Sequence, residues 1–186
     1  MAGFFKKLFG GNEQAEPAPA LPAETPAVQT VAANDLSAPL GGTVVELSDV
    51  SDQMFASGAL GPGVAIEPVS GTVVAPADGI VTVAFPTGHA FGIRTTDGLE
   101  ILIHVGFDTV ELDGKFFNAK VEKGATVKRG DVLVEFDLEE VKTAGYPVTT
   151  PLVITNAKVA ISSVQALNVG SQVAAGDAIL TVERKG

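Results

Sequence analysis

The two histidines of this chain are the residues whose type and setting can support chemistry. His104 follows three apolar residues, Ile101 to Ile103, and precedes Val105 and Gly106, so its imidazole stands in a run typical of a buried strand. Burial without a charged partner favours the neutral imidazole, whose free ring nitrogen can act as a nucleophile or a metal ligand. The Gly106 carbonyl is placed to accept a hydrogen bond from Nδ1 of His104, which would leave Nε2 free.

His89 is the other histidine, and it lies 15 positions before His104. Each follows an apolar segment, and Asp97-Gly98 between them is typical of a hairpin turn. Residues 89 and 104 lie 8 and 7 positions from Asp97, so an antiparallel pair would place them near cross-strand positions. The pattern predicts a shared site, although a lone histidine on an apolar strand is more often a core residue. Aromatic residues that could surround it, or equally belong to the core, are Phe55, Phe85, Phe91 and Phe107.

Several other chemistries lack the residues they need. The chain has no cysteine, no His-Glu-x-x-His pattern, no phosphate-binding glycine loop and no Gly-x-Ser-x-Gly motif. A catalytic zinc site usually needs three protein ligands, and two histidines fall short of that number. The net charge of −10 argues against nucleic acid as a partner and favours proteins with basic surfaces. The remaining possibility is that a histidine acts as the nucleophile for a group that is transferred between molecules. Phosphoryl is the group that best fits this chemistry.

The elements that must position these side chains are short strands. Valine-rich runs bounded by Gly, Pro or Asp predict an all-β domain, an antiparallel β-sandwich or hybrid barrel with short helical turns. The expected strands are 43–47, 63–66, 72–74, 79–85, 101–104, 117–119, 132–136, 152–154 and 179–182, with helical turns in 49–57 and 138–144. Residues 124–133 and 170–179 share Gly, Val and Gly-Asp at equal spacing, which indicates pseudo-symmetric hairpins of one sheet.

The amino-terminal third differs from this domain. In residues 1–12, Phe4, Phe5 and Leu8 stand beside Lys6 and Lys7, which favours weak association of an amphipathic segment with anionic lipid. Residues 13–33 are rich in Pro and Ala and are expected to form a flexible linker, and the folded domain is expected to span 34–186. No apolar run is long enough to span a membrane.

The central stretch resembles a known family. Gly98-x-x-Ile101-Leu102-Ile103-His104-Val105-Gly106-Phe107 is similar to the signature of the glucose-type IIA component of the bacterial phosphoenolpyruvate-dependent sugar phosphotransferase system. The likeness extends to the residues around Pro76, Thr87 to Phe91, Gly130-Asp131 and Thr150 to Asn156, and so covers about 38–183.

The resemblance implies a phosphotransferase component that carries phosphohistidine. His104 would accept a phosphoryl group on Nε2 from the carrier protein HPr and pass it to a cysteine of a IIB domain during sugar uptake. His89 would support the transfer, and Thr87 would orient His89. Partners would dock on a surface containing Asp52, Phe55, Phe91 and Asp108. No cofactor would be required, but His89 and His104 could hold zinc together with a carboxylate from a regulated partner.

The resemblance also implies a cytoplasmic protein, peripheral at the inner face of the membrane if its first residues bind lipid. From its ends, the chain is expected to be a free IIA protein, not part of a fused permease. Regulation of permeases or kinases by binding is a further expected role. The alternative is a regulatory module that binds such partners without relaying phosphate to sugar.

Overall fold

The computed structural model describes residues 31–186. The expected membrane-associating segment, 1–12, and all of the expected linker up to residue 30 lie outside the described residues. The first strand begins at Asp35, and the predicted start of the folded domain at Asn34 stays a prediction. Within 31–186, no helix is long and apolar enough to cross a membrane.

The predicted all-β class is confirmed: the described residues form antiparallel strands with a few short helices. The strands are β1 (Asp35–Ser37), β2 (Gly42–Glu46), β3 (Gly63–Pro68), β4 (Thr72–Val74), β5 (Gly79–Ala84), β6 (Ala90–Thr95), β7 (Glu100–His104), β8 (Phe117–Ala119), β9 (Thr126–Val127), β10 (Val132–Phe136), β11 (Thr150–Ile154), β12 (Ile161–Ala166), β13 (Gln172–Val173) and β14 (Ala178–Arg184). The helices are η1 (Leu47–Asp49), α1 (Gln53–Ala56), η2 (Thr109–Leu112), α2 (Leu138–Thr143) and α3 (Ala157–Ala160).

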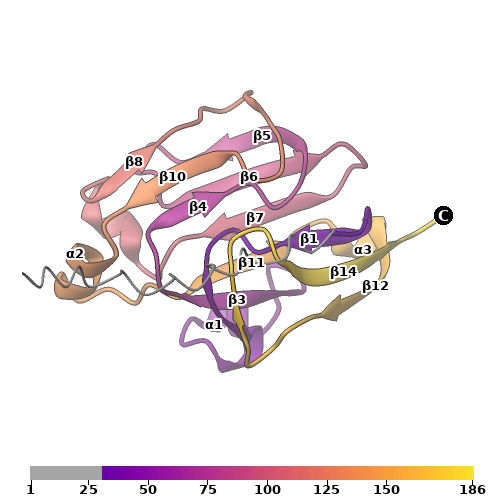
Figure 1. Cartoon of the computed structure of the whole chain (residues 1–186), viewed down its shortest axis with the longest axis horizontal. Helices are drawn as coiled ribbons and strands as arrows, with labels where there is room; N and C mark the ends of the chain where they lie inside the picture. Colours follow the sequence, from indigo (N-terminus) through magenta and orange to yellow (C-terminus); the bar gives the residue numbers. More distant parts are fainter. Residues whose placement is uncertain (1–30) are drawn as a thin grey trace, which may run out of the picture.

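One large sheet has the strand order β13-β2-β3-β11-β7-β6-β5-β9, and two small sheets have the orders β1-β14-β12 and β4-β10-β8. In Figure 1 the strands β4, β8 and β10 gather on one side of the molecule, and β1, β12 and β14 gather on another. Alternate residues of the large sheet, such as Ile101 and Ile103, enter the main core together with residues of both small sheets.

The opposite face of the large sheet carries a second apolar cluster. Ala65, Leu102 and Val153 point to this outer face, because they alternate with main-core residues along β3, β7 and β11. Leu47, Val50 and Phe55 from the segment between β2 and β3 cover them. Leu102 and His104 lie two residues apart on β7, so His104 is on this outer face as well.

The strand orders show an internal repeat in which one half is nested inside the other. Elements β4 to β10 reproduce β1, β2, β3, β11, β12, β13 and β14, in the same sheet positions. The backbone contacts match: Gly130 N donates to Ala75 O in one half, and Gly176 N donates to Ala38 O in the other. The predicted similarity of 124–133 and 170–179 therefore reflects two equivalent turns.

The expected strands are present, and several elements were missed, among them β12 and α3. Strand β12 has exposed Ser162, Ser163 and Gln165, so its sequence lacks the apolar alternation that marks a strand. The single turn α3 before it is too short for a helical period to show. The expected helical turn in 49–57 is divided into η1 and α1.

The two equivalent turns predict equal losses of stability on substitution. Asp131 Oδ2 accepts from Lys128 N at 2.8 Å, and Asp177 Oδ2 accepts from Ala174 N at 2.8 Å. Asp131→Ala and Asp177→Ala should each lower the free energy of unfolding by about 1 kcal/mol, because each leaves a turn amide without its acceptor. Urea unfolding measures this. The control is Glu122→Ala, since Glu122 is exposed and its side chain has no hydrogen bond within 31–186; a loss in the control equal to those in the turns would contradict the prediction.

Candidate functional site

Pairing of β6 with β7 brings the two histidines together. His104 lies opposite Ala90, and the next backbone bond joins Val105 N to His89 O at 2.7 Å. The imidazole centroids are 4.9 Å apart with an interplanar angle of 72°. The predicted hairpin and the predicted meeting of the two rings are confirmed, with the register displaced by one residue from the sequence estimate.

The tautomer of His104 is fixed by the backbone. Its Nδ1 lies 2.7 Å from the carbonyl oxygen of Gly106, and a carbonyl can only accept, so Nδ1 carries the proton. In the neutral ring Nε2 then has a free lone pair. Gly106 adopts φ of 73°, and a Cβ there would lie 2.5 Å from Pro147 O, so this backbone path requires glycine.

His89 is held by the turn that precedes β6. Thr87 Oγ1 lies 2.5 Å from Nδ1 of His89, so the hydroxyl either donates to this nitrogen or accepts from it. Gly88 has φ of 70° and allows the tight return from Phe85 to His89. The Phe85 ring centroid is 5.1 Å from that of His89, and His89 itself is only 3% exposed.

Two acidic residues stand near His104 without contacting it through a hydrogen bond. Asp52 caps α1, where its Oδ1 accepts from Met54 N at 2.8 Å and from Phe55 N at 3.3 Å. Asp108 is exposed, with φ of 57°, at the start of η2. Both carboxylates act on His104 through their charge, which favours its protonated form.

Burial outweighs those charges. It lowers the pKa of His104 below its usual value, while the bond to Gly106 and the charges of Asp52 and Asp108 oppose part of this change. Burial, with a smaller contribution from the charge of His104, lowers the pKa of His89 to about 4. Both rings are therefore neutral at pH 7, as a pair of adjacent imidazoles requires.

The aromatic residues named from the sequence divide between two environments. Phe55 is 4% exposed, lies on the outer face with Phe107, and places its ring centroid 5.6 Å from that of His104. Phe91 was expected on the partner surface, and this expectation is wrong. It is fully buried in the main core, because it pairs with Ile103 and points to the inner face of the sheet.

Two of the exposed apolar side chains beside the site, those of Met54 and Val110, were not predicted from the sequence, whereas Phe85 was. Met54 follows Asp52 in α1 and is 55% exposed, and Val110 follows Asp108 in η2 and is 52% exposed. Phe85, which contacts His89, is 43% exposed. Residue type does not show whether a side chain is exposed. The only signal in the sequence was that Met54 and Val110 each lie two residues after an aspartate that had already been selected. We call Met54, Phe85 and Val110 the apolar rim of the site, in which His89 is buried and His104 is partly buried.

No group of three or more His, Cys, Asp or Glu side chains that could hold a metal occurs within 31–186. The histidine pair could supply two ligands, which leaves the remainder of a zinc shell to another molecule. Zinc binding thus stays a prediction.

The fold and site define a class: antiparallel β proteins that present a neutral histidine, with a fixed tautomer and a second imidazole beside it, on an outer sheet face. Residues 34–160 match the family model described as phosphoenolpyruvate-dependent sugar phosphotransferase system, EIIA 1. The chain belongs to this family.

Individual relatives agree. The chain is 54% identical, over 124 residues, to the beta-glucoside-specific EIIBCA component of Halalkalibacterium halodurans, covering 67% of this chain and 20% of that protein. It is 45% identical to the glucose-specific EIIA component of the same organism, covering 82% of this chain and 83% of that one. The solved glucose permease IIA from Mycoplasma capricolum matches with a TM-score of 0.74 and 38% identity, covering 79% of this chain and 94% of that chain. The chain spans about a fifth of the length of the EIIBCA relatives.

The lowered pKa values predict a pH-dependent stability. Above pH 6.5 the histidines are neutral in both folded and unfolded chains, but between pH 6.5 and about 4 the unfolded chain binds protons that folded His89 does not. Stability should therefore fall as the pH is lowered through this range. Imidazole NMR should show His89 titrating near pH 4 and His104 below 6.5. Titration of either ring at or above pH 6.5 would contradict the assignment.

The backbone at Gly106 predicts a large effect of one methyl group. Gly106→Ala should lower the free energy of unfolding by about 2 to 5 kcal/mol, because positive φ and the contacts with Pro147 O and Thr109 both oppose a Cβ. Gly98→Ala is the matched control, since Gly98 has φ of 89° but nothing within 4 Å of an added Cβ. It should cost about 1 kcal/mol. Equal losses in the two variants would show that crowding at Gly106 is unimportant.

Proposed function

We propose that this chain is a phosphocarrier that accepts a phosphoryl group on Nε2 of His104 from phosphorylated HPr and passes it to a cysteine of a IIB domain during sugar uptake. The observation that carries the proposal is the bond from His104 Nδ1 to Gly106 O at 2.7 Å, which leaves Nε2 as a lone-pair donor. Family membership supports the same role.

In the first step the Nε2 lone pair forms a bond to phosphorus while the phosphorus–nitrogen bond of the donor's phosphohistidine breaks. In the second step the cysteine thiolate sulfur forms a bond to phosphorus while the bond from phosphorus to Nε2 of His104 breaks, and the electron pair of that bond returns to Nε2, so that His104 is again neutral. Transfer of this kind passes through a loose transition state, so positioning and charge stabilisation are the main contributions of the protein.

His89 is the group that supports the transferring phosphoryl. When the Thr87 hydroxyl donates to Nδ1, the proton of neutral His89 is on Nε2, which can then donate to a phosphoryl oxygen. The two ring centroids are 4.9 Å apart, a separation that lets both rings reach one phosphoryl group. Thr87 is thus a positioning residue that selects the useful tautomer.

Partner docking would use the rim of the site. Asp52 and Asp108 offer carboxylates to a basic partner, and Met54, Phe85 and Val110 offer apolar surface around them. Relatives described as EIIBCA components support IIB as the acceptor. We place this exchange in the cytoplasm, and a zinc ion shared with a partner's carboxylate remains an additional proposal for the histidine pair.

Phosphorylation tests the assignment. Full-length protein incubated with phosphoenolpyruvate, enzyme I and HPr should acquire one acid-labile, alkali-stable phosphoryl group. His104→Gln should acquire none, because the other imidazole of the site, His89, carries its proton on Nε2 and has no free lone pair there. His89→Gln should still be labelled but should pass the group to IIB about 100-fold more slowly, because it lacks the supporting imidazole.

Reactions without HPr are the control for direct labelling, and circular dichroism shows whether each variant folds. Label that survives in folded His104→Gln would refute the proposal. A His89→Gln variant that transfers at the normal rate would refute the role of His89. A protein that binds a permease or kinase equally well with and without label, and never labels IIB, would be the regulatory module instead.

A further inference from the structure

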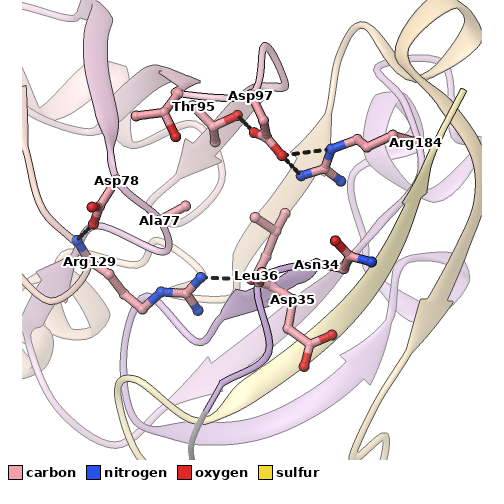
Figure 2. Close-up of a pocket in the computed structure, with 11 residues that line it drawn as sticks. Asn34, Asp35, Leu36, Ala77, Asp78, Thr95, Asp97, Arg129 and Arg184 are labelled. Carbon is pink, nitrogen blue, oxygen red and sulfur yellow. Dashed lines mark hydrogen bonds and ion pairs between the residues drawn. The ribbon is translucent and has the colours of Figure 1, made fainter. Parts of the chain in front are cut away.

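The hairpin formed by β6 and β7 has a buried threonine beside each of its ends. At the turn, Figure 2 shows Thr95 bonded to Asp97, and Asp97 bonded to Arg184 at the end of β14. At the histidine end, Thr109 is fully buried, and its Oγ1 donates to Val105 O at 2.6 Å. The first threonine ties the turn to β14, whereas the second lies beside the backbone that holds His104.

The Gly106 carbonyl that fixes the His104 tautomer belongs to a peptide unit that glycine leaves free to rotate. This carbonyl and the N–H of Phe107 are in the same peptide and point in opposite directions. If the peptide turned over, it would present N–H to Nδ1 of His104. Nδ1 would then have to accept, and the proton of the neutral ring would move to Nε2. The observed orientation is therefore the one that leaves the Nε2 lone pair free.

Contacts on both sides hold this peptide in the observed orientation. Phe107 N donates to Pro147 O at 3.1 Å, which directs the Gly106 carbonyl the opposite way. The preceding peptide is held by the Thr109 hydroxyl through Val105 O, and no other donor to this oxygen occurs within 31–186. The Thr109 methyl packs on Gly106, since a Cβ added there would lie 2.6 Å from Cγ2. Thr109 thus contacts the backbone on both sides of the rotatable bond.

The other nested half ends its equivalent strand without such a turn. The bond from Ile154 N to Pro62 O is the counterpart of the bond from Val105 N to His89 O. After Ile154 the chain enters α3, and residues 155–160 contain no left-handed residue, whereas the turn between β7 and η2 contains two. The fold can therefore end this strand in a simpler way, and the turn held by a threonine belongs to the half that carries the histidines.

We propose that Thr109 is a positioning residue that keeps the proton of His104 on Nδ1, because it holds the Gly106 carbonyl in place. Removal of its hydroxyl leaves the buried Val105 carbonyl without a donor, which favours rotation of the neighbouring peptide. The use of Nε2 in transfer rests on the proposed phosphocarrier function. The position of the proton does not, and it is measured without any transfer.

The tautomer of His104 tests the proposal in long-range proton–nitrogen NMR spectra of the full chain at pH 7. The bond to Gly106 O should favour the Nδ1-protonated form about tenfold, the factor that one hydrogen bond gives in a ratio of two states. Thr109→Val keeps the shape but loses the hydroxyl, so the two tautomers should become about equally populated. Thr109→Ser keeps the hydroxyl and should retain the Nδ1-protonated form.

Thr95→Val is the matched control, because it also replaces a buried hydroxyl by a methyl group beside the same hairpin. Thr95 Oγ1 accepts from Leu99 N at 2.9 Å, so this variant should lose stability in urea unfolding. Its His104 tautomer should be that of the unaltered chain. If Thr109→Val does not fold, Thr109→Ala replaces it, and the comparison with Thr109→Ser then isolates the hydroxyl.

Phosphorylation by phosphorylated HPr gives a second measurement on the same variants. In Thr109→Val the maximal rate should fall by the same factor as the Nδ1-protonated share, about twofold, while the KM for HPr stays unchanged. Folded Thr109→Val whose His104 stays wholly Nδ1-protonated would overturn the proposal. So would an equal tautomer change in Thr95→Val, a loss of the Nδ1-protonated form in Thr109→Ser, or a raised KM with an unchanged tautomer. An unaltered chain that is never labelled on His104 would refute the phosphocarrier role instead, and the tautomer would still decide the role of Thr109.

Discussion

The antiparallel pairing of β6 with β7 is the constraint on which the site depends. The backbone bond from Val105 N to His89 O joins the strands just beyond the last residue pair, where both imidazoles leave the sheet. A shift of this register by one residue would turn His104 toward the inner face and exchange it with Ile103. Main-core packing of Ile101 and Ile103 therefore fixes the position of the His104 imidazole on the other face of the same strand.

Differences between the two nested halves account for the rest of the site. The connection between β5 and β6 is short and delivers Thr87 and His89, whereas its counterpart between β2 and β3 is long and contains η1 and α1. That longer segment lies on the outer face, where Phe55 reaches His104. The repeated strands thus form a common scaffold, and the segments that differ between the two halves carry the residues of the candidate site.

The sequence predicted the structure correctly where a pattern of residues is compatible with only one arrangement of the chain. Apolar runs between Gly and Asp predicted most strands, and the Asp97-Gly98 turn predicted the meeting of His89 and His104. The contact of His104 with Gly106 O followed because they are two residues apart. Phe91 was misplaced because residue type cannot tell which face of a strand points inward. Met54 and Val110 were missed for a related reason: exposure depends on segments that fold back from elsewhere in the chain.

Burial gives His104 two properties that oppose each other in most sites. It holds the ring neutral and so keeps the Nε2 lone pair available, yet it also restricts the approach of a large donor. In the proposed function the exposed rim of Met54, Phe85 and Val110 would resolve this conflict, because a partner with a matching apolar surface could dock on it and exclude water as it reaches the ring. In the proposed function the carboxylates of Asp52 and Asp108 would serve the partner, since burial outweighs their charge in determining the protonation state of His104.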